Sequence, residues 1–506
     1  MKLVDIDQIK KRDAAYKSRE HNELACKLHA LYEDAATSMT FNYLKSLGLG
    51  NPENTQHPFE VSVLRRIIDS VSVVYNTPAT RSLILNGEEL EDDDPLVKAT
   101  NAAFDASGYD LIWQRIDALR NLYKTCVVEW AEDSANNCVG AIVYGPHQVY
   151  RSPNAAAPHN IEMDDAILLK VRDAVDDRDC VFRLWRFDNG WRSWLVDGSG
   201  DALPDQPYGA DGEVPYDCLP LQTIYAEAPM FRAWLPMPAS RVAWCLGINA
   251  SINDLAYLVQ QEAHSIKVLK TDSSRVPTEI GPGTVVKTEV EGGLDVLSQS
   301  PKISESVGVL DQQLRLFAIS EYLPGNLFAS DYAQAHTGQA LRVAMHPLSM
   351  QRWRQTQLVQ QQEAKAWQIY TAIHNANARA WGVAPLPDAA QINVVCSSAW
   401  QPNDIRESQE VGFKNLAAGM KSRPMLAQDL FGMSRQQAIH HIEKVKRDNE
   451  LWPVKEVQNP GAMVSDAGPL VALGEDSASV NPDAFNPDIA SSTEGASVVS
   501  AVEPEL

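Results

Sequence analysis

The sequence lacks the motifs by which common enzymes bind nucleotides or activate a nucleophile. It contains no G-x-x-x-x-G-K-[ST] phosphate loop, no G-x-S-x-G and no H-E-x-x-H. Gly281 and Gly283 form a short glycine turn, but a β-branched run follows it, so no helix N-terminus is available for a phosphate. The acidic residues form no convergent acid–base pair. We therefore expect neither a catalytic site nor a bound cofactor.

Paired cysteines, long apolar runs and positive charge are also scarce. The seven cysteines are scattered and include no C-x-x-C pair, which favours reduced thiols and a cytosolic origin and excludes a zinc ribbon. The N-terminus is charged and excludes a secretory signal, and no apolar run is expected to span a bilayer. A net charge of −22 excludes a broad basic face that grips nucleic acid, but not a conduit through which DNA slides.

An acidic run, EELEDDD, follows an Asn-Gly turn at residues 86–94. Carboxylates are calcium ligands, but these do not alternate at the fixed positions of a calcium loop. We interpret the run as a solvated loop whose acids precede a helix, where the helix dipole favours negative charge. A bound cation at 86–94 stays the alternative.

Helical periodicity predominates before residue 125. Residues 5–47 are predicted to be helical, an apolar stripe from Val63 to Val74 predicts a helix that ends before Pro78, and 97–124 form another helix. Between 125 and 228, short alternating runs separated by Asp-Asn-Gly and Asp-Gly turns predict antiparallel strands. The sequence therefore predicts an α+β fold.

A long helix over residues 239–270 is the clearest prediction, at roughly 45 Å for 1.5 Å per residue. The runs TVVKTEV and LDVLS after it predict a small β-hairpin, which is barely stable alone and needs something to pack on. Another copy of the chain would supply that partner. Residues 304–321 then form a second amphipathic helix and 322–338 a loop rich in Pro, Gly, Asn and Ser.

The C-terminal third is predicted to be mainly helical. A helix runs from about 339 to 380 with a kink at Pro347, a strand follows at 391–400, and 403–452 form short helices, the last capped by Ser434. After residue 453, acids far outnumber the one lysine and hydrophobicity is low, so we predict a disordered tail.

This ordered series resembles the portal proteins of tailed bacteriophages over roughly residues 20–453. The resemblance rests on LPMPASRVAWCLGINASINDLAYLVQQEAHSIKVLK, then IGPGTVVKTEVEGGLDVLSQSP, then LRLFAISEYLPGNLFASDYAQAHTGQALRVAM. It is also carried by VLRRIIDSVSVVYNTPA, GPHQVYRSP and AWQPNDIRESQEVGFKNLAAGMKSRPML. No single motif is diagnostic, since portals have no catalytic signature.

The resemblance implies a dodecameric, non-enzymatic ring at one capsid vertex of the virion, assembled in the host cytoplasm, through which double-stranded DNA is packaged and ejected. Its implied partners are the terminase large subunit, the major capsid and scaffold proteins and a head-tail adaptor. The implied parts are a wing (1–238), stem helices (239–270 and 304–321), a clip (271–303), a tunnel loop (322–338), a wing helix and strand (339–402), a crown (403–453) and an acidic tail (454–506).

The resemblance also implies roles for individual residues. The predicted DNA-facing loop residues are Asn326, Asp331, Tyr332, Gln334 and His336. The predicted channel or clip cations are Lys267, Lys270, Arg315 and Arg342. The predicted intersubunit stem contacts are Ile248, Ile252, Leu255 and Val259.

Two other hypotheses stay open at the sequence level. A nucleic-acid-processing enzyme with a helical clamp would cleave its substrate through a metal held by Asp92, Asp93 and Asp94. A different virion protein, such as a head-tail adaptor, is disfavoured by the length of 506 residues, because adaptors are usually shorter.

Overall fold

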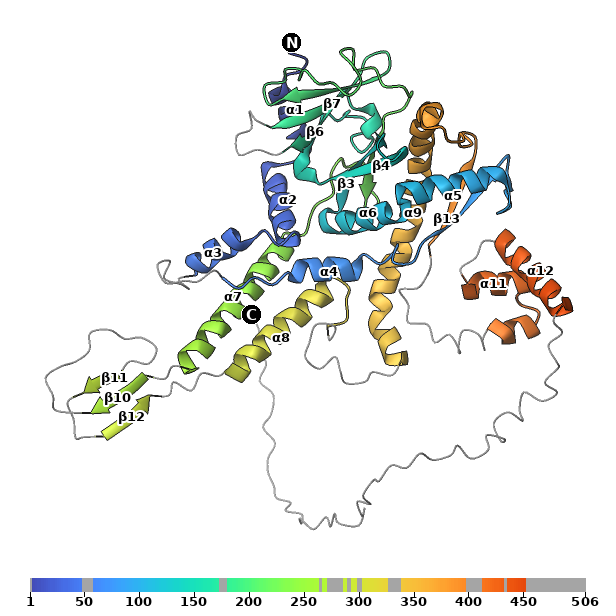
Figure 1. Ribbon diagram of the computed structural model, residues 1–506. Helices are drawn as coiled ribbons and strands as arrows, with labels where there is room; N and C mark the ends of the chain where they lie inside the picture. The colour runs from blue at the N-terminus through green and yellow to red at the C-terminus, as the bar shows by residue number, and fades with distance from the viewer. Residues whose placement is uncertain are drawn as a thin grey trace, which may run out of the picture. The chain divides into compact units, whose positions relative to one another are not determined.

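The computed structural model describes most of the chain before residue 452 (Figure 1). The described residues are 2–47, 58–172, 180–263, 266–270, 285–288, 293–297, 303–325, 338–396, 412–431 and 435–451. The chain divides into two compact units, Met1–Lys444 and Val445–Leu506. The predicted tail, Ser434 and all five predicted DNA-facing loop residues lie outside the described residues.

Six helices precede the β region, as the periodicity predicted. They are α1 (Ile6–Asp13), α2 (Arg19–Tyr32), α3 (Thr37–Ser46), α4 (Val63–Val71), α5 (Pro95–Ser107) and α6 (Tyr109–Tyr123). The prediction of one helix over 97–124 is wrong, because Gly108 adopts a left-handed conformation with φ of 61° and separates α5 from α6. Asp94 caps α5 by accepting a hydrogen bond from Leu96 N, which confirms the acidic run as a helix start.

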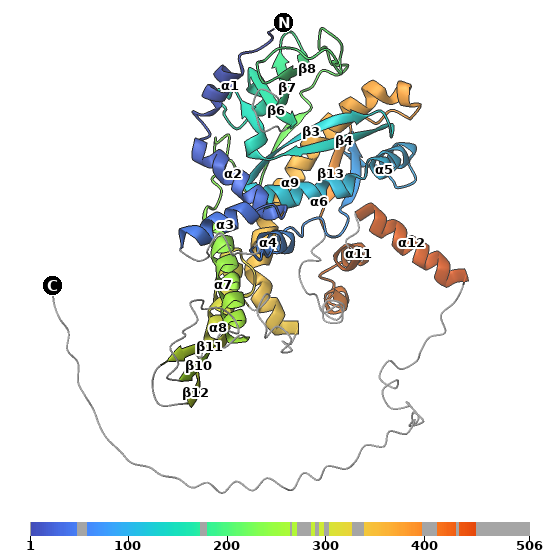
Figure 2. The ribbon, with the colours of Figure 1, turned by 60° about the vertical axis from the view of Figure 1, so that its left-hand side comes forward.

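The described strands of the β region are antiparallel, as predicted, and they are divided between two sheets. One has the order β4-β3-β9, with β3 (Thr125–Asp133), β4 (Cys138–Tyr144) and β9 (Leu221–Tyr225). The other has the order β5-β6-β7-β8, with β5 (Val149–Arg151), β6 (Ala166–Arg172), β7 (Val181–Phe187) and β8 (Trp191–Asp197). Helix α1 lies against β5 and β6 (Figure 2). Short 3₁₀ helices occur at Pro146–Gln148 and Ile161–Met163.

A buried carboxylate joins the two sheets. Glu129 of β3 is fully buried and accepts hydrogen bonds from Arg183 Nη1 at 2.9 Å, Trp185 Nε1 at 3.1 Å and Tyr144 Oη at 2.8 Å. Arg183 and Trp185 lie on β7 of the other sheet. Because a buried charge must be paired, this set of contacts fixes how the sheets meet.

A third sheet brings residues from distant parts of the chain together. Its order is β13-β1-β2, with β1 (Thr80–Leu85), β2 (Glu88–Glu89) and β13 (Gln391–Val395), all antiparallel. Asn86 and Gly87 both have positive φ, 54° and 87°, which is the conformation of a tight two-residue hairpin turn. The predicted turn before the acidic run and the predicted strand near 391 are confirmed.

The midsection differs from its prediction. Helix α7 (Ser240–Ala263) ends before residue 270, and β10 (Ile266–Lys270) follows as a strand. The predicted two-stranded hairpin is also wrong, because β10 lies between β11 (Val285–Thr288) and β12 (Gly293–Leu297). It pairs in parallel with β11 and antiparallel with β12. The apolar run Ile-Lys-Val-Leu-Lys fits both a helix and a strand, and here strand pairing decides.

Further helices complete the described part of the main unit. Helix α8 (Ile303–Ser320) matches its prediction, and α9 (Gly338–Trp381) continues through Pro347. Helix α9 contacts β3, β4, β9 and β13, and its Trp367 and Tyr370 join an aromatic core with Phe104, Tyr109 and Trp130. Helices α11 (Arg423–Phe431) and α12 (Arg435–Leu451) lie in the predicted helical region, and α12 crosses the boundary between the two units.

Acid should destabilise the fold because protonation of His21 is unfavourable in the folded chain. Burial, reinforced by the neighbouring Lys17, lowers the pKa of His21 to about 4. The unfolded chain therefore binds a proton that the folded chain refuses between pH 6.5 and 4, so the free energy of unfolding falls as pH falls through that window. We expect His21→Gln to reduce this acid slope in urea titrations, compared with the unmodified chain. Equal slopes for His21→Gln and the unmodified chain would contradict the expectation.

Candidate assembly surface on the α7–α8 helix pair

Helices α7 and α8 form an antiparallel pair. Three contacts define the pairing, and their numbers run in opposite directions along the two helices. Arg241 forms an ion pair with Glu321, Trp244 stacks on Phe317 with ring centroids 6.2 Å apart, and Ser251 Oγ donates to Gln313 Oε1 at 3.1 Å. The side of α8 that carries Leu310, Leu314 and Phe317 belongs to the core that contains Ile248.

A cluster of polar side chains, which we call the hub, joins the base of this helix pair to the rest of the unit. Its members are Asp117, Arg120, Asn121, Arg241, Glu321, Arg352 and Gln355. Arg241 Nε and Nη2 donate to the Glu321 carboxylate at 2.7 and 2.6 Å. Its Nη1 donates to the main-chain oxygens of Asn121 and Leu122, at 2.7 and 2.9 Å, at the end of α6. One arginine thus joins α6, α7 and the residue that follows α8.

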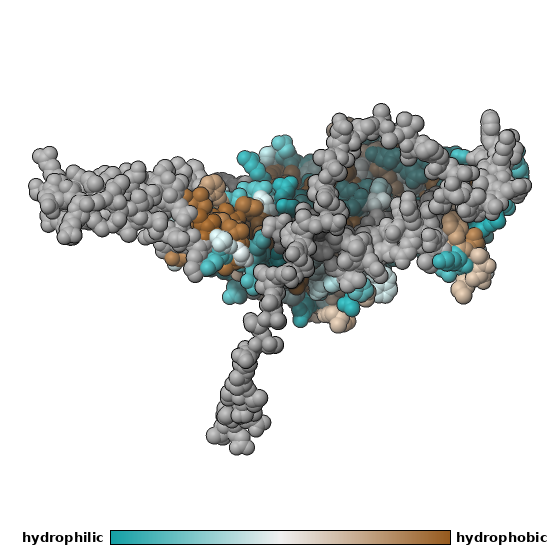
Figure 3. All heavy atoms as spheres, turned by 90° about the horizontal axis from the view of Figure 1, so that it is seen from below, coloured by the Kyte–Doolittle hydropathy of each residue, from teal (hydrophilic) through white to brown (hydrophobic). Residues whose placement is uncertain are grey.

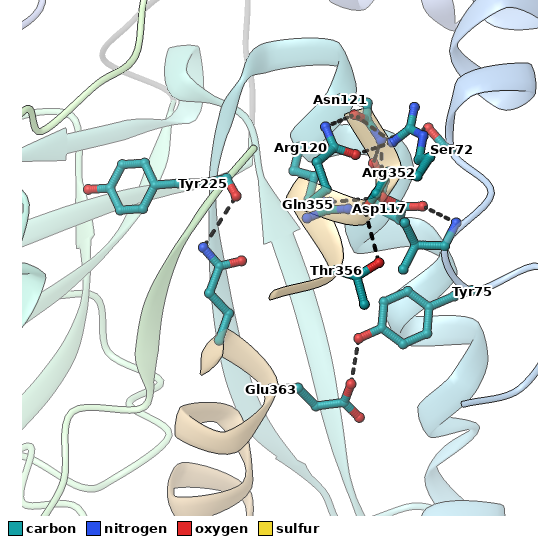
Figure 4. Close-up of polar contacts among 12 residues, drawn as sticks. Ser72, Tyr75, Asp117, Arg120, Asn121, Tyr225, Arg352, Gln355, Thr356 and Glu363 are labelled. Atoms are coloured by element: carbon teal, nitrogen blue, oxygen red, sulfur yellow. Dashed lines mark hydrogen bonds and ion pairs between the residues drawn. The ribbon is translucent and has the colours of Figure 1, made fainter. Parts of the chain in front are cut away.

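Helix α9 also contributes side chains to the hub around Asn121 (Figure 4). Arg352 Nη1 donates to Asn121 Oδ1 at 3.4 Å, and Gln355 Nε2 donates to the same oxygen at 3.3 Å. Asn121 Nδ2 in turn donates to Asp117, which also accepts from Arg120 at 2.6 and 2.8 Å. The hub therefore connects both helices that flank residues 322–338 to α6.

The hub contains more positive than negative charge. Its arginines are Arg120, Arg241 and Arg352, and its carboxylates are Asp117 and Glu321. Arg352 is fully buried, and its Nε and Nη2 donate to no acceptor among the described residues. Burial lowers the pKa of Arg352 to about 10, and the two nearby carboxylates only partly oppose this. Arg352 is thus the surplus charge of the hub.

The described residues of the chain leave an apolar surface on α8 exposed. Val309, Leu316 and Ile319 are 54%, 46% and 58% exposed and recur at intervals of seven and three residues, so they lie on one side of the helix. We call these three residues the α8 stripe. Figure 3 shows, from below, an apolar patch beside the grey atoms at its left. Large exposed apolar surfaces of this kind mark interaction sites.

The predicted stem contacts on α7 are only partly exposed. The assignment of Ile248 is wrong, because this residue is fully buried in the chain's own core. Ile252 packs against the same core, Leu255 is half-buried and Val259 is 48% exposed. Sequence periodicity found the apolar side of α7, but it could not distinguish packing inside the chain from packing between chains.

The other predicted site residues are dispersed. Lys267 and Lys270 lie on β10, Arg315 is half-buried on α8, and Arg342 lies on α9. The acids proposed for a nuclease do not converge. Asp93 pairs with Lys98 at 3.0 Å and Asp94 caps α5. Within the described ranges, no group of three His, Cys, Asp or Glu side chains is placed to hold a metal ion.

Helix α7 also has an unexpected composition. Its segment Ser240–Val259 is long and apolar enough to cross a membrane by length and composition, because Arg241 and Asp254 are its charged residues. The expectation that no apolar run reaches this length is therefore wrong. Helices in protein cores pass the same test, and the first half of this one packs against the core of its own chain.

Comparison with known proteins gives limited information. No protein-family model and no curated protein matches the chain. Among solved structures, a chain of the virion of a native gene transfer agent particle is similar, with a TM-score of 0.41, 14% identity, and coverage of 78% of this chain and 93% of that one. A chain from the neck of an empty gene transfer agent particle has a TM-score of 0.40, 12% identity and the same coverage. TM-scores below 0.5 are too low to support a functional inference.

Proposed function

We propose that this chain is the subunit of a portal, a ring-shaped channel at one capsid vertex through which double-stranded DNA is packaged and ejected. The observation that carries the proposal is the α8 stripe. An antiparallel helix pair leads from the core to a small separate sheet and exposes large aliphatic side chains along the second helix. Such a surface is stabilised when further copies of the chain cover it, and a ring of copies covers it in every subunit.

The chemistry of the chain suits passage of DNA without adhesion. The net charge of −22 per copy would repel phosphates across most of a ring. Sparse cations, which we take to include Lys267, Lys270, Arg315 and Arg342, would make weak contacts that do not depend on base sequence. In this proposal Asn326, Asp331, Tyr332, Gln334 and His336 face the duplex from the loop between α8 and α9.

The proposal assigns separate surfaces to separate partners. The β10–β12 sheet would dock the terminase large subunit during packaging and the head-tail adaptor afterwards. The β-rich wing would meet the major capsid and scaffold proteins. Twelve subunits are expected. The protein would have no catalytic activity of its own, and the terminase would supply the ATP hydrolysis that drives DNA inward.

The test is the assembly state of the full-length protein. Native mass spectrometry of the purified chain should give one large species at a multiple of 55.9 kDa, and negative-stain images should show rings with an axial hole. The measurements should be made at low and high salt, because repulsion between the negatively charged copies can prevent ring assembly when it is not screened. A stable monomer at micromolar concentration under every salt condition would contradict the proposal.

A further inference from the structure

Helix α7 is covered on two opposite sides. Ser251 and Trp244 face α8. Asn249 is two residues before Ser251, and at 100° per residue it lies about 200° away around the helix. There its Oδ1 accepts a hydrogen bond from Val61 N at 3.1 Å. An extended segment, Phe59–Val61, therefore lies along the side of α7 opposite α8, and we call it the strap.

The strap exposes apolar side chains to solvent while hydrogen bonds to α7 hold its main chain in place. Asn253 binds Phe59 twice: its Oδ1 accepts from Phe59 N and its Nδ2 donates to Phe59 O, both at 2.8 Å. Phe59 and Val61 are nevertheless 63% and 47% exposed. Main-chain anchoring of this kind reduces the entropy that a partner must remove on binding, which is a property of preorganised interfaces.

The α8 stripe is the second exposed apolar surface of the α7–α8 pair. Ile319 is two residues after Phe317, which stacks on α7, and so it points about 200° away from α7. Leu316 lies within about 60° of Ile319 by the same rotation. Leu316, one residue before Phe317, lies about 100° from it, so the stripe occupies a flank of α8, whereas the strap lies on the side of α7 opposite α8.

Two different apolar surfaces on different sides of the helix pair favour head-to-tail contact. A single apolar surface would suit a two-fold dimer, in which the same patch meets itself, whereas two distinct patches allow each copy to bind the next and close a ring. We infer that the α8 stripe of one copy packs on the strap of its neighbour, with Ile319 and Leu316 against Phe59 and Val61. This inference rests on the proposed ring and adds which surfaces meet in it.

Cross-linking of cysteine variants tests the contact. The background is Cys26→Ser, because Cys26 is the exposed native thiol, while the other six are buried or half-buried. With a short bismaleimide, Phe59→Cys/Ile319→Cys should give a ladder of covalent multimers. Phe59→Cys alone and Ile319→Cys alone should stay monomeric on denaturing gels. Arg19→Cys/Ile319→Cys is the control, because Arg19 is more exposed than Phe59 but lies on α2.

The outcomes separate this inference from the proposed function. Rings in negative stain together with a 59–319 ladder support both. Rings without that ladder, or dimers from Ile319→Cys alone, overturn the strap contact and leave the portal proposal intact. Absence of rings for the unmodified chain overturns both. If Phe59→Cys impairs assembly, Val61→Cys/Leu316→Cys should give the same ladder, and its failure in intact rings overturns the inference.

Discussion

Replacing Leu316 and Ile319 with glutamate should convert the assembled protein into a monomer with an unchanged fold. Both side chains are about half exposed in the single chain, so their replacement should change its free energy of unfolding by no more than about 0.5 kcal/mol. In the assembly each glutamate would be an unpaired charge in an apolar contact, which costs several kcal/mol. A cost of about 1.4 kcal/mol already weakens association tenfold, so assembly should be lost at micromolar concentration.

Native mass spectrometry and analytical ultracentrifugation measure this result, and circular dichroism checks the fold. The matched control is Val383→Glu, which also places a charge on an exposed aliphatic residue but lies beyond the end of α9. The control should assemble like the unmodified chain. If the Leu316→Glu/Ile319→Glu variant formed rings in the same yield as the control, α8 would not face a neighbouring copy. Ile252 is unsuitable for this test, because its side chain packs in the core of its own chain.

Replacing Arg241 with methionine should be the most destabilising single change at the base of the helix pair. The Arg241 and Glu321 side chains are 2% and 12% exposed, and the arginine also satisfies two main-chain oxygens of α6. Removing one partner of a buried ion pair typically costs about 3–5 kcal/mol, because the other charge is left in a dry environment. The free energy of unfolding should fall by about that amount.

Urea unfolding in the monomeric Leu316→Glu/Ile319→Glu background measures the effect without a contribution from assembly. Arg19→Met is the control: Arg19 pairs with Glu23 at 2.9 Å, but their side chains are 91% and 52% exposed. Such a surface pair contributes at most about 1 kcal/mol. If the two methionine variants lost equal stability, the hub would not be the element that holds α7 and α8 to α6.

Much of the fold could be predicted from the sequence, because the hydrophobic residues of many helices and strands recur with one clear period. The antiparallel region, α8 and the Asn86–Gly87 turn were found because their patterns depend on residues close in sequence. The split at Gly108 and the strand at 266–270 were missed. A left-handed glycine and a five-residue apolar run are each compatible with a continuous helix until tertiary contacts decide.

The polar hub could not be predicted, for a different physical reason. Arg352, Gln355 and Glu363 lie on a helix whose Gln-rich sequence suggests solvent exposure, yet all three are buried. Glu363, which lies outside the hub, likewise accepts hydrogen bonds from Tyr75 and Arg81, which are more than 280 residues away in sequence. Burial of a charge depends on a partner, and hydropathy along one helix contains no information about partners on another.

The antiparallel register of α7 with α8 continues into the strands, where Ile266 pairs with Leu297. The strand that follows α7 and the strand that precedes α8 are therefore neighbours in one sheet. Lengthening both arms equally, by two residues each, would preserve which side chains face which way and extend the reach by about 7 Å at 3.4 Å per residue. The length of this sheet can thus change while the helices that carry it stay as they are.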